Sequence, residues 1–303
     1  MRNLLIILLF ICAKPFAQHT PLLNQYMFNG VALNPAYTGS EEALSMVATL
    51  RAQWIGFPGA PTTQAFTIHA PLKKSNSAIG LQVFADQIGI NRNTGIFGSY
   101  AYRIRFKEST LSFGLAGGIN LQKTYYSRLD VVDLQDQLLI NDSPMGILPD
   151  FSFGIHYYST NYFLSFSAPF FLTHDYDGVD FNITNDFKNY NLMLGGGYVF
   201  RFKNELELKP SVLAKYRYKE KLQFDFNLML KFSQYFGAGI SYRTNDALIA
   251  LININVTKQF AIMYSFGMPL SPIFKYNSGS HELSLKYNML FKTGLSSPRF
   301  LGF

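Results

Sequence analysis

Long segments of strict two-residue alternation constrain this chain more than any other feature. Between Leu111 and Gln122, odd positions hold Leu, Phe, Leu, Gly, Ile and Leu, while even positions hold Ser, Gly, Ala, Gly, Asn and Gln. A β-strand points successive side chains to opposite faces, so this segment has one apolar face and one face of small and polar side chains. The alternation returns over 223–232 and 281–292. The chain is therefore predicted to be all-β.

About fourteen strands are expected along the chain. They are predicted near 43–54, 62–71, 77–87, 93–105, 110–123, 149–158, 162–170, 190–202, 205–216, 223–232, 236–243, 247–257, 260–268 and 281–292. Many of these segments have ten or more residues, whereas strands of globular proteins most often have about five or six. A tilted strand needs about 9–11 residues to cross a bilayer. The lengths favour strands that span a membrane.

The links between these strands differ in length in a regular way. Links at 72–76, 106–109, 159–161, 203–204, 233–235 and 258–259 are short. The links that alternate with them are longer on average, notably 124–148, 171–189 and 269–280, although 244–246 is short. Outer-membrane barrels combine tight periplasmic turns with longer outer loops. The less apolar face carries mainly small and uncharged side chains, and only 15% of all residues are charged. We therefore predict an antiparallel transmembrane β-barrel over residues 43–292.

Three further segments flank the predicted barrel. Residues 1–17 have a basic start and an apolar stretch of ten residues, as a secretory signal peptide does, and they include Cys12, the only cysteine. Residues 18–42 lack alternation and are rich in turn formers and aromatic residues, so they are expected to form a periplasmic cap or plug. Residues 293–303 form a C-terminal tail. The net charge of +7 is spread along the chain and predicts no nucleic-acid partner.

Several sequence blocks resemble the PorP/SprF family of outer-membrane proteins of the type IX secretion system. The first block is Gln25-Tyr26-Met27-Phe28-Asn29, and the second runs from Asn34 to Ser40 as Asn-Pro-Ala-Tyr-Thr-Gly-Ser. A third block runs from Gln53 to Pro61 as Gln-Trp-Ile-Gly-Phe-Pro-Gly-Ala-Pro. The family-motif positions expected to be structural are Gln25, Asn29, Asn34, Pro35, Tyr37, Gly39, Arg51, Gln53, Trp54, Gly56, Phe57, His69 and Pro71.

This resemblance implies a role in secretion in the cell outer membrane and no enzymatic activity or cofactor. Members are expected to act as partners or surface anchors for an exported protein with a C-terminal signal, such as an adhesin of gliding motility. Periplasmic and lipoprotein components of the machinery are further expected partners, besides the outer-membrane lipid around the barrel.

Two groups of residues are candidates for contact with such a partner. Trp54, Phe57 and Pro58 belong to the first outer loop, although Trp54 also suits an interface anchor at the end of the first strand. Leu138, Leu139 and Ile140 lie in the long link 124–148, where apolar residues suit either partner contact or packing over the barrel mouth.

The residues leave two other functions open. Arg51, Arg103 and Arg105 share the inward phase with Asp86, Glu205, Glu207 and Asp225, which suits either mutual neutralisation or a passive porin or small-solute transporter. His69, His156 and Ser152 also point inward, so a lipid hydrolase is a further hypothesis, although no Gly-x-Ser-x-Gly motif is present. Residues 174–180 resemble a calcium loop but lack its final Glu, and no metal site is predicted.

Overall fold

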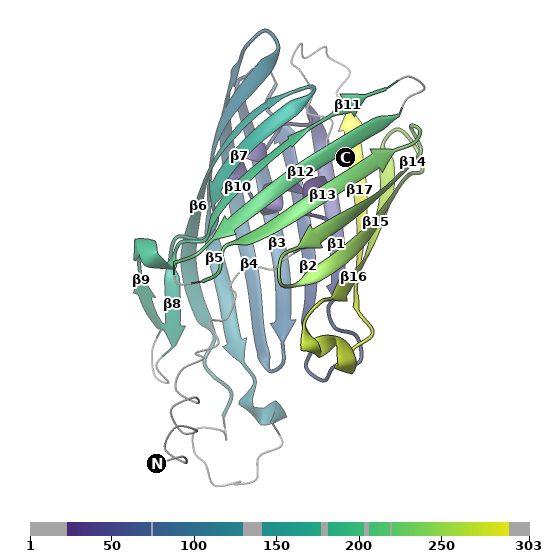
Figure 1. Cartoon of the computed structure of the whole chain (residues 1–303). Helices are drawn as coiled ribbons and strands as arrows, with labels where there is room; N and C mark the ends of the chain where they lie inside the picture. The colour runs from purple at the N-terminus through teal and green to yellow at the C-terminus, as the bar shows by residue number, and fades with distance from the viewer. Residues whose placement is uncertain are drawn as a thin grey trace, which may run out of the picture.

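A closed antiparallel β-sheet forms the wall of the molecule in the computed structural model, which describes residues 23–73, 75–129, 141–176, 181–202, 206–218 and 220–290 (Figure 1). Within these ranges the wall has fourteen strand positions, because β10 and β11 both pair with β12 and share one position. The wall strands are β1 Ala43–Ala52, β2 Thr62–Pro71, β3 Ser77–Ile88, β4 Asn91–Arg105, β5 Ser109–Thr124, β6 Gly146–Ser159, β7 Tyr162–Ala168, β10 Leu192–Tyr198, β11 Phe200–Arg201, β12 Glu207–Tyr216, β13 Gln223–Lys231, β14 Phe236–Arg243, β15 Ala247–Asn255, β16 Phe260–Pro269 and β17 Ser280–Leu290.

The sheet closes between its first and last strands. β1 pairs with β17, and Arg51 lies opposite Glu282 in that register. On the other side of the barrel, β10 pairs with both β7 and β12. Closure leaves no strand edge facing hydrocarbon, where an unpaired backbone group would cost several kcal/mol. The predicted all-β barrel fold is thus confirmed.

Most strand boundaries lie within one to three residues of those predicted, and three of the differences have a clear local cause. The first strand ends at Ala52, because Trp54 has a φ of 49° and cannot continue an extended chain. The seventh strand ends before Pro169, which has no N–H, and before Phe170, whose φ is 61°. The eighth position is interrupted at Val199, near Pro210 of the neighbouring strand, which has no N–H to donate to the ladder.

One hairpin was not predicted. β8 Thr173–Tyr176 pairs with β9 Phe181–Thr184 in a separate two-stranded sheet within the link 169–191 (Figure 1). Each strand has only four residues, too few for the alternation to stand out from a polar loop.

The two ends of the barrel carry different connections. The short-turn end holds the turns at 72–76, 106–108 and 232–235, together with the start of β1. The long-loop end holds the links 53–61, 125–145, 169–191 and 270–279, with 3-10 helices η5 Tyr126–Arg128, η6 Phe187–Asn189 and η7 Pro272–Tyr276. In Figure 1 the long-loop end lies at the bottom. This asymmetry is the one predicted from the link lengths.

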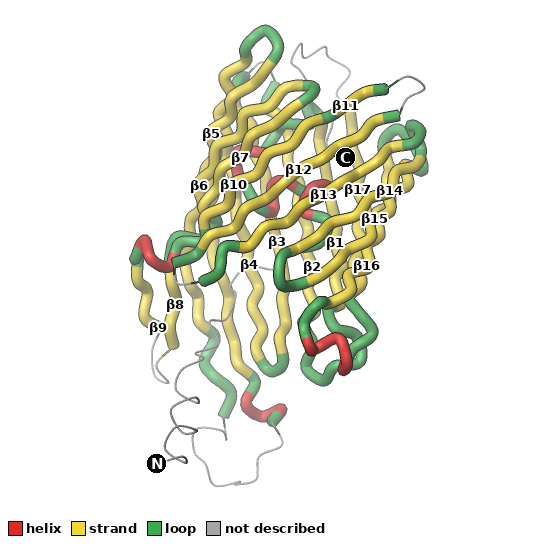
Figure 2. Tube along the Cα trace, in the orientation of Figure 1, coloured by secondary structure: helices red, strands yellow, loops and turns green. Residues whose placement is uncertain are grey.

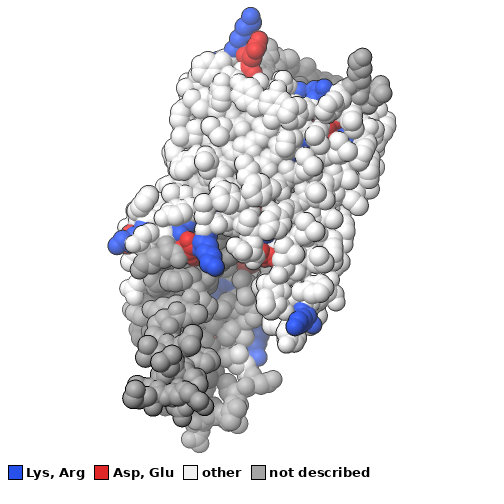
Figure 3. All heavy atoms as spheres, in the orientation of Figure 1, with Lys and Arg blue, Asp and Glu red and all other residues white. Residues whose placement is uncertain are grey.

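Apolar side chains cover the outside of the wall. Exposed large apolar residues alternate along every long strand, as Phe226 and Leu228 do against buried Asp225, Asn227 and Met229. Figure 3 shows charged side chains near the ends of the barrel and an uncharged surface between them on the face in view. Tyr100, Tyr102, Tyr162, Tyr198, Tyr216 and Tyr242 are exposed near strand ends, as aromatic girdles are.

No helix in the described part of the chain is long and apolar enough to cross a membrane.

Residues 23–42, here called the lumen segment, lie inside the barrel. They contain the 3-10 helices η2 Tyr26–Phe28, η3 Gly30–Ala32 and η4 Pro35–Tyr37, which Figure 2 shows as short red turns between the walls. Asn34 caps η4 by accepting from the Ala36 N–H at 2.8 Å, and Pro35 occupies its first position. The Asn-Pro-Ala-Tyr sequence therefore encodes the turn of the segment directly.

Candidate functional site

Glu282 of β17 holds the first residues of the lumen segment. Its carboxylate accepts the backbone N–H groups of Asn24 and Gln25 at 2.7 and 2.8 Å, and it pairs with Arg51 at 3.3 Å. All of these groups are buried. Hydrogen bonds to a carboxylate are among the stronger ones in proteins, and a paired buried carboxylate is costly to remove. This contact fixes the segment near the long-loop end.

Arg243 of β14, three strands along the sheet from β17, binds the same part of the segment. Its guanidinium pairs with Asp225 at 3.2 Å and reaches the Leu23 carbonyl at 3.4 Å. Lys215 completes this group by pairing with Asp225 at 2.8 Å. Two of the inward charges predicted from the strand phase, Asp225 and Arg51, are thus neutralised, but by Arg243 and Glu282, which the prediction did not name.

Two further ion pairs hold the other end of the segment near the short-turn end. Glu41 pairs with Lys286 at 2.8 Å, and Glu42 pairs with Arg103 at 2.7 Å. Burial acts to raise the pKa of Glu41, but the Lys286 ammonium outweighs it together with smaller favourable interactions, and the pKa of that carboxyl is lowered. Glu41 is therefore ionised at neutral pH and binds Lys286 as a carboxylate.

Asn34 and Ala36 occupy a socket made by two glycines. Gly114 of β5 and Gly154 of β6 lie opposite each other in the register. A Cβ on Gly114 would fall on the backbone of Pro35 and Ala36, and a Cβ on Gly154 would fall on the Asn34 side chain. The Asn34 amide donates to the Ile155 carbonyl, the Phe166 carbonyl and the Ser165 hydroxyl, at 3.1, 3.2 and 2.7 Å. The missing side chains let the segment touch the wall backbone.

Gly39 and His69 join the segment to β2. The Gly39 N–H donates to Nδ1 of His69 at 3.1 Å, and the Gly39 carbonyl accepts from Arg103 at 2.7 Å. Gly39 has a φ of 78°, and an added Cβ would also meet Ala78, so the position requires glycine. The Tyr37 ring meets the His69 ring edge-on.

Apolar contacts join the segment to the wall in three places. Met27 and Phe28 pack with Met229, Ile249, Leu251 and Met263. Leu23 packs with Ala65, Phe84 and Phe97, while Val31 and Tyr37 pack with Tyr158. Inward wall positions here are apolar because they face the segment and not water.

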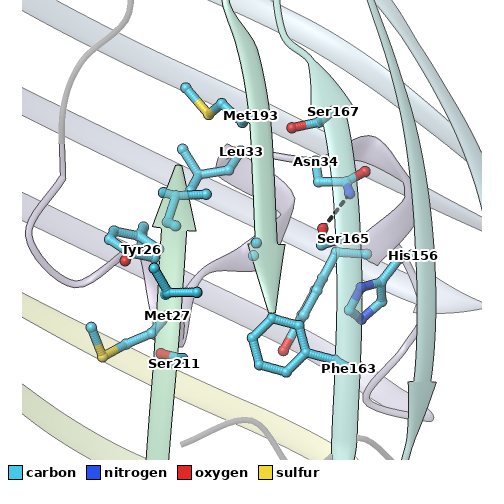
Figure 4. A pocket seen from close by; sticks show the side chains of 15 residues that line it. Tyr26, Met27, Leu33, Asn34, His156, Phe163, Ser165, Ser167, Met193 and Ser211 are labelled. Atoms are coloured by element: carbon cyan, nitrogen blue, oxygen red, sulfur yellow. Dashed lines mark hydrogen bonds between the residues drawn. The ribbon is translucent and has the colours of Figure 1, made fainter. Parts of the chain in front are cut away.

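Small cavities remain between the segment and the wall. One of about 70 Å³ is lined by Met27, Leu33, Phe163 and Met193 among others, and Figure 4 shows Asn34 bonded to Ser165 at its side. Another of about 20 Å³ is lined by Val31, Pro35 and Phe170 among others. An apolar cavity that holds benzene measures about 150 Å³, so both are small.

Two loops at the long-loop end are joined into one ordered surface, here called the loop surface (residues 53–61 and 270–279). The Ile55 N–H donates to the Gly279 carbonyl at 2.8 Å, and the Ser278 N–H donates to the Ile55 carbonyl at 2.8 Å. The Gln53 N–H closes the first loop by donating to the Pro61 carbonyl at 2.9 Å. Gly56 and Gly59 have φ values of 91° and 71°, which allows the tight path of this loop.

The loop surface exposes apolar side chains. Phe57 is 40% exposed, Phe274 54% and Tyr276 69%, and Ile55 and Leu270 are also exposed. Trp54 supports Phe57 through an edge-on ring contact. Exposed apolar groups held by backbone hydrogen bonds suit a contact with another macromolecule, because little entropy is lost when they bind.

The residues singled out from the sequence divide between these two regions. Gln25, Asn29, Asn34, Pro35, Tyr37 and Gly39 lie in the lumen segment; Arg51, His69 and Pro71 lie in the wall; and Gln53, Trp54, Gly56, Phe57 and Pro58 lie in the first loop. Asn29 accepts from the Thr67 hydroxyl at 2.8 Å. Trp54 lies in the loop, two residues beyond the end of β1, so the prediction that the first strand extends to Trp54 is wrong.

Several predictions fall outside the described residues. These are the signal peptide 1–17, the tail 293–303, Glu205, and Leu138, Leu139 and Ile140. The part of the 174–180 loop from 177 onward also lies outside them.

The structure adds residues that the sequence did not single out for these contacts. Lys286, Gly114 and Gly154 contact the lumen segment, and the second loop, 270–279, supports the first. Arg103 is predicted to point inward by its strand phase, but its pairing partner Glu42 cannot be predicted from phase alone. Among the candidate catalytic groups, Ser152 accepts the Phe170 N–H at 3.3 Å, and the His156 ring stacks on Tyr158.

Solved structures with a similar fold are outer-membrane barrels of very low sequence identity. The CymD monoaromatic hydrocarbon channel is 12% identical, with 88% of this chain and 93% of that chain covered and a TM-score of 0.51. A Pseudomonas aeruginosa FadL homologue is 10% identical, covering 90% and 96%, with a TM-score of 0.48. Acinetobacter baumannii Omp33 is 9% identical, covering 82% and 100%, also with a TM-score of 0.48. None of the curated proteins matches.

The sequence itself carries the stronger match. Residues 15–287, nearly the whole chain, fit the family described as type IX secretion system membrane protein PorP/SprF. This range includes the lumen segment, the first loop and almost the complete wall. The barrel fold and the family together place the protein in the outer membrane. The chain belongs to the PorP/SprF family of type IX secretion system membrane proteins.

Proposed function

We propose that this barrel is a partner and surface anchor for an exported protein that carries a C-terminal signal, such as a gliding adhesin. Membership of a secretion-system family supports a role with that machinery, including its periplasmic and lipoprotein components. The observation that carries the proposal is the loop surface, an ordered group of exposed apolar side chains at the long-loop end, which faces outward in outer-membrane barrels. We assign Trp54, Phe57 and Pro58 to cargo contact, with Phe274 and Tyr276 beside them.

The alternative of a passive porin has less support. The lumen segment contacts the wall through ion pairs, hydrogen bonds and three apolar clusters. A conducting pore needs a continuous aqueous path, as in the larger porins. No reaction is assigned to His69 and His156, since both rings support Tyr37.

The test is a comparison of cell surfaces. A deletion strain is complemented with the wild-type chain, with Phe57→Asp, or with Phe187→Asp. Phe187 is a matched control, because it is 68% exposed at the same end of the barrel but lies in a different loop. Surface proteins with C-terminal signals are quantified after protease shaving, and barrel abundance is measured in the outer membrane.

The proposal expects the deletion to remove one or a few of these proteins from the surface. Phe57→Asp should reduce their display at least tenfold at normal barrel abundance, because a buried unpaired carboxylate opposes docking. Phe187→Asp should restore display. Unchanged display in the deletion strain would refute the proposed function, and equal display in the two variants would refute the role of the loop.

A further inference from the structure

The lumen segment contacts the wall around almost its whole circumference. On one side it binds β2 through Thr67, β4 through Ser99 and β7 through Ser165. On the other side it binds β13 through Asn227, at 2.7 Å from the Tyr26 hydroxyl, and β16 through Ser265. The remaining contacts described above involve β3, β5, β6, β14, β15 and β17. Because the segment contacts strands on opposite sides of the barrel, it fills the cross-section of the lumen between them.

The segment also spans the lumen along the barrel axis. The Leu23 carbonyl accepts from Arg243, the last residue of β14 at the long-loop end. Glu42 pairs with Arg103 and lies 3.6 Å from Arg105, the last residue of β4 before the turn 106–108 at the short-turn end. The chain therefore passes from one end of the lumen to the other. Hydrogen bonds to buried Glu282 and Arg243 hold its first end, and buried ion pairs of Glu41 and Glu42 hold its second end.

The contacts are too numerous and too well fitted for a segment that leaves the lumen readily. Lys286 and Arg103 would each lose a buried ion-pair partner if it left, and an unpaired buried charge is costly. Glu282 would keep Arg51 but lose the two backbone N–H groups that it accepts. Gly114 and Gly154 would lose the chain that fills their socket. The cavities of about 70 and 20 Å³ beside the segment are far smaller than a folded or extended polypeptide.

We propose that residues 23–42 are a fixed plug that seals the barrel, so that the protein acts on its partners through its two end surfaces and conducts neither solutes nor polypeptide. This inference stands on the lumen contacts alone. It holds or fails independently of the proposed cargo contact.

The first experiment measures conductance. The purified full-length chain is inserted into planar lipid bilayers in KCl solution, and wild type is compared with Ala36→Phe and Leu33→Phe. Ala36 is completely buried against Gly114, so a phenyl ring there has no space and must displace the plug. Leu33 is the matched control, because it lies in the same segment but lines both cavities. Neither change alters a wall strand.

The proposal expects wild type and Leu33→Phe to be silent and Ala36→Phe to show open-channel steps. Ohmic conductance of the wild type would overturn the proposal. Silence of Ala36→Phe would also overturn it, because the seal would then lie elsewhere in the barrel.

The second experiment tests whether the plug moves in living cells. Thr38 and Ser99 face each other with 2.9 Å between their hydroxyl oxygens, so Thr38→Cys with Ser99→Cys places two thiols within reach of one another for a disulfide. The sole natural cysteine, Cys12, lies in the predicted signal peptide. The two thiols are oxidised by diamide, which takes up their electrons and protons, and the bond is detected by the gel shift after reduction.

A fixed plug predicts a bond in most of the membrane-inserted chains and unchanged surface display of C-terminally tagged proteins in the cross-linked strain. Absence of the bond, or a loss of display that dithiothreitol restores, would show that the plug is elsewhere or must move. Wild-type conductance and cross-linking need no cargo, so these results remain decisive if the proposed function fails.

Discussion

At the scale of single residues, the socket formed by Gly114 and Gly154 depends on the absence of two side chains. Both glycines are inward positions of long strands, where a larger residue would satisfy the strand pattern equally well. The structure explains them by the Asn34–Ala36 backbone that lies against them. A strand pattern shows which way a position faces, but it does not show what comes to lie against it.

Replacement of Gly154 by Ala should destabilise the protein by about 1–3 kcal/mol, because the new methyl group must displace Asn34. Urea unfolding in lipid vesicles measures this loss. Gly98→Ala is the control, since the nearest atom to its added Cβ is 4.0 Å away on Gly117. Equal unfolding midpoints for the two variants would contradict the socket.

Acid should loosen the end of the plug that Glu41 holds. The pKa of Glu41 is lowered in the folded chain, so its carboxylate stabilises the fold above the unfolded pKa, and this contribution is lost as the pH falls through the folded value. Hydrogen exchange of the Ser40 and Glu42 amides, corrected for intrinsic rates, should accelerate below about pH 4 relative to β13 amides.

Lys286→Met is the control for this effect, because it removes the cation that lowers the pKa of Glu41. Its Ser40 and Glu42 amides should lose the acid-induced acceleration. Acceleration of equal size in this variant would show that another group causes it.

At the scale of elements, the strands were the most predictable part of the chain. Alternation, in many cases over ten or more residues, identified the wall strands, because outward residues meet one environment along the whole length. Single residues interrupt or end strands where the pattern predicts that they continue. Pro210 lies beside the interruption at Val199, and β7 ends before Phe170, which has a positive φ. The short hairpin β8–β9 gave no such signal.

The pairing of distant loops was not predictable from local pattern. Ile55 and Gly279 are separated by most of the chain and meet only because β1 and β17 close the barrel. The sequence motif of the first loop could be recognised, whereas its hydrogen bonds to residues 270–279 form only because the barrel closes. A candidate site formed where the first and last strands of a barrel pair can therefore be identified only from the structure.

The loop surface should exchange its bonded amides slowly despite its exposure. The Ile55 and Ser278 N–H groups are both donated, and Gly279→Ala should free them, because Gly279 has a φ of 96° and its added Cβ would meet Phe266. Exchange at both amides should rise about tenfold or more, while β13 amides serve as the reference in the same sample. Rapid exchange of both amides in the wild type would show that the loops are not joined.

At the scale of the whole molecule, two environments explain the distribution of side chains. The outside of the wall meets lipid, and the inside meets the lumen segment. Inward Ile249, Leu251 and Met263 therefore break the simple rule that the inner face is polar, because they pack against Met27 and Phe28. The barrel was predictable from composition, alternation and link lengths, whereas the apolar contacts inside it were not.

Site-directed spin labelling along β13 tests the central claim most directly, namely that the apolar phase of each strand faces lipid around a closed barrel. Single cysteines replace Phe226, Asn227, Leu228 and Met229 in turn, with Cys12 as the only natural cysteine, and accessibility to oxygen and to a water-soluble nickel complex is measured in membranes. The account predicts high oxygen accessibility at 226 and 228 and low accessibility to both reagents at 227 and 229. High nickel accessibility at 226 and 228, or no alternation, would contradict it.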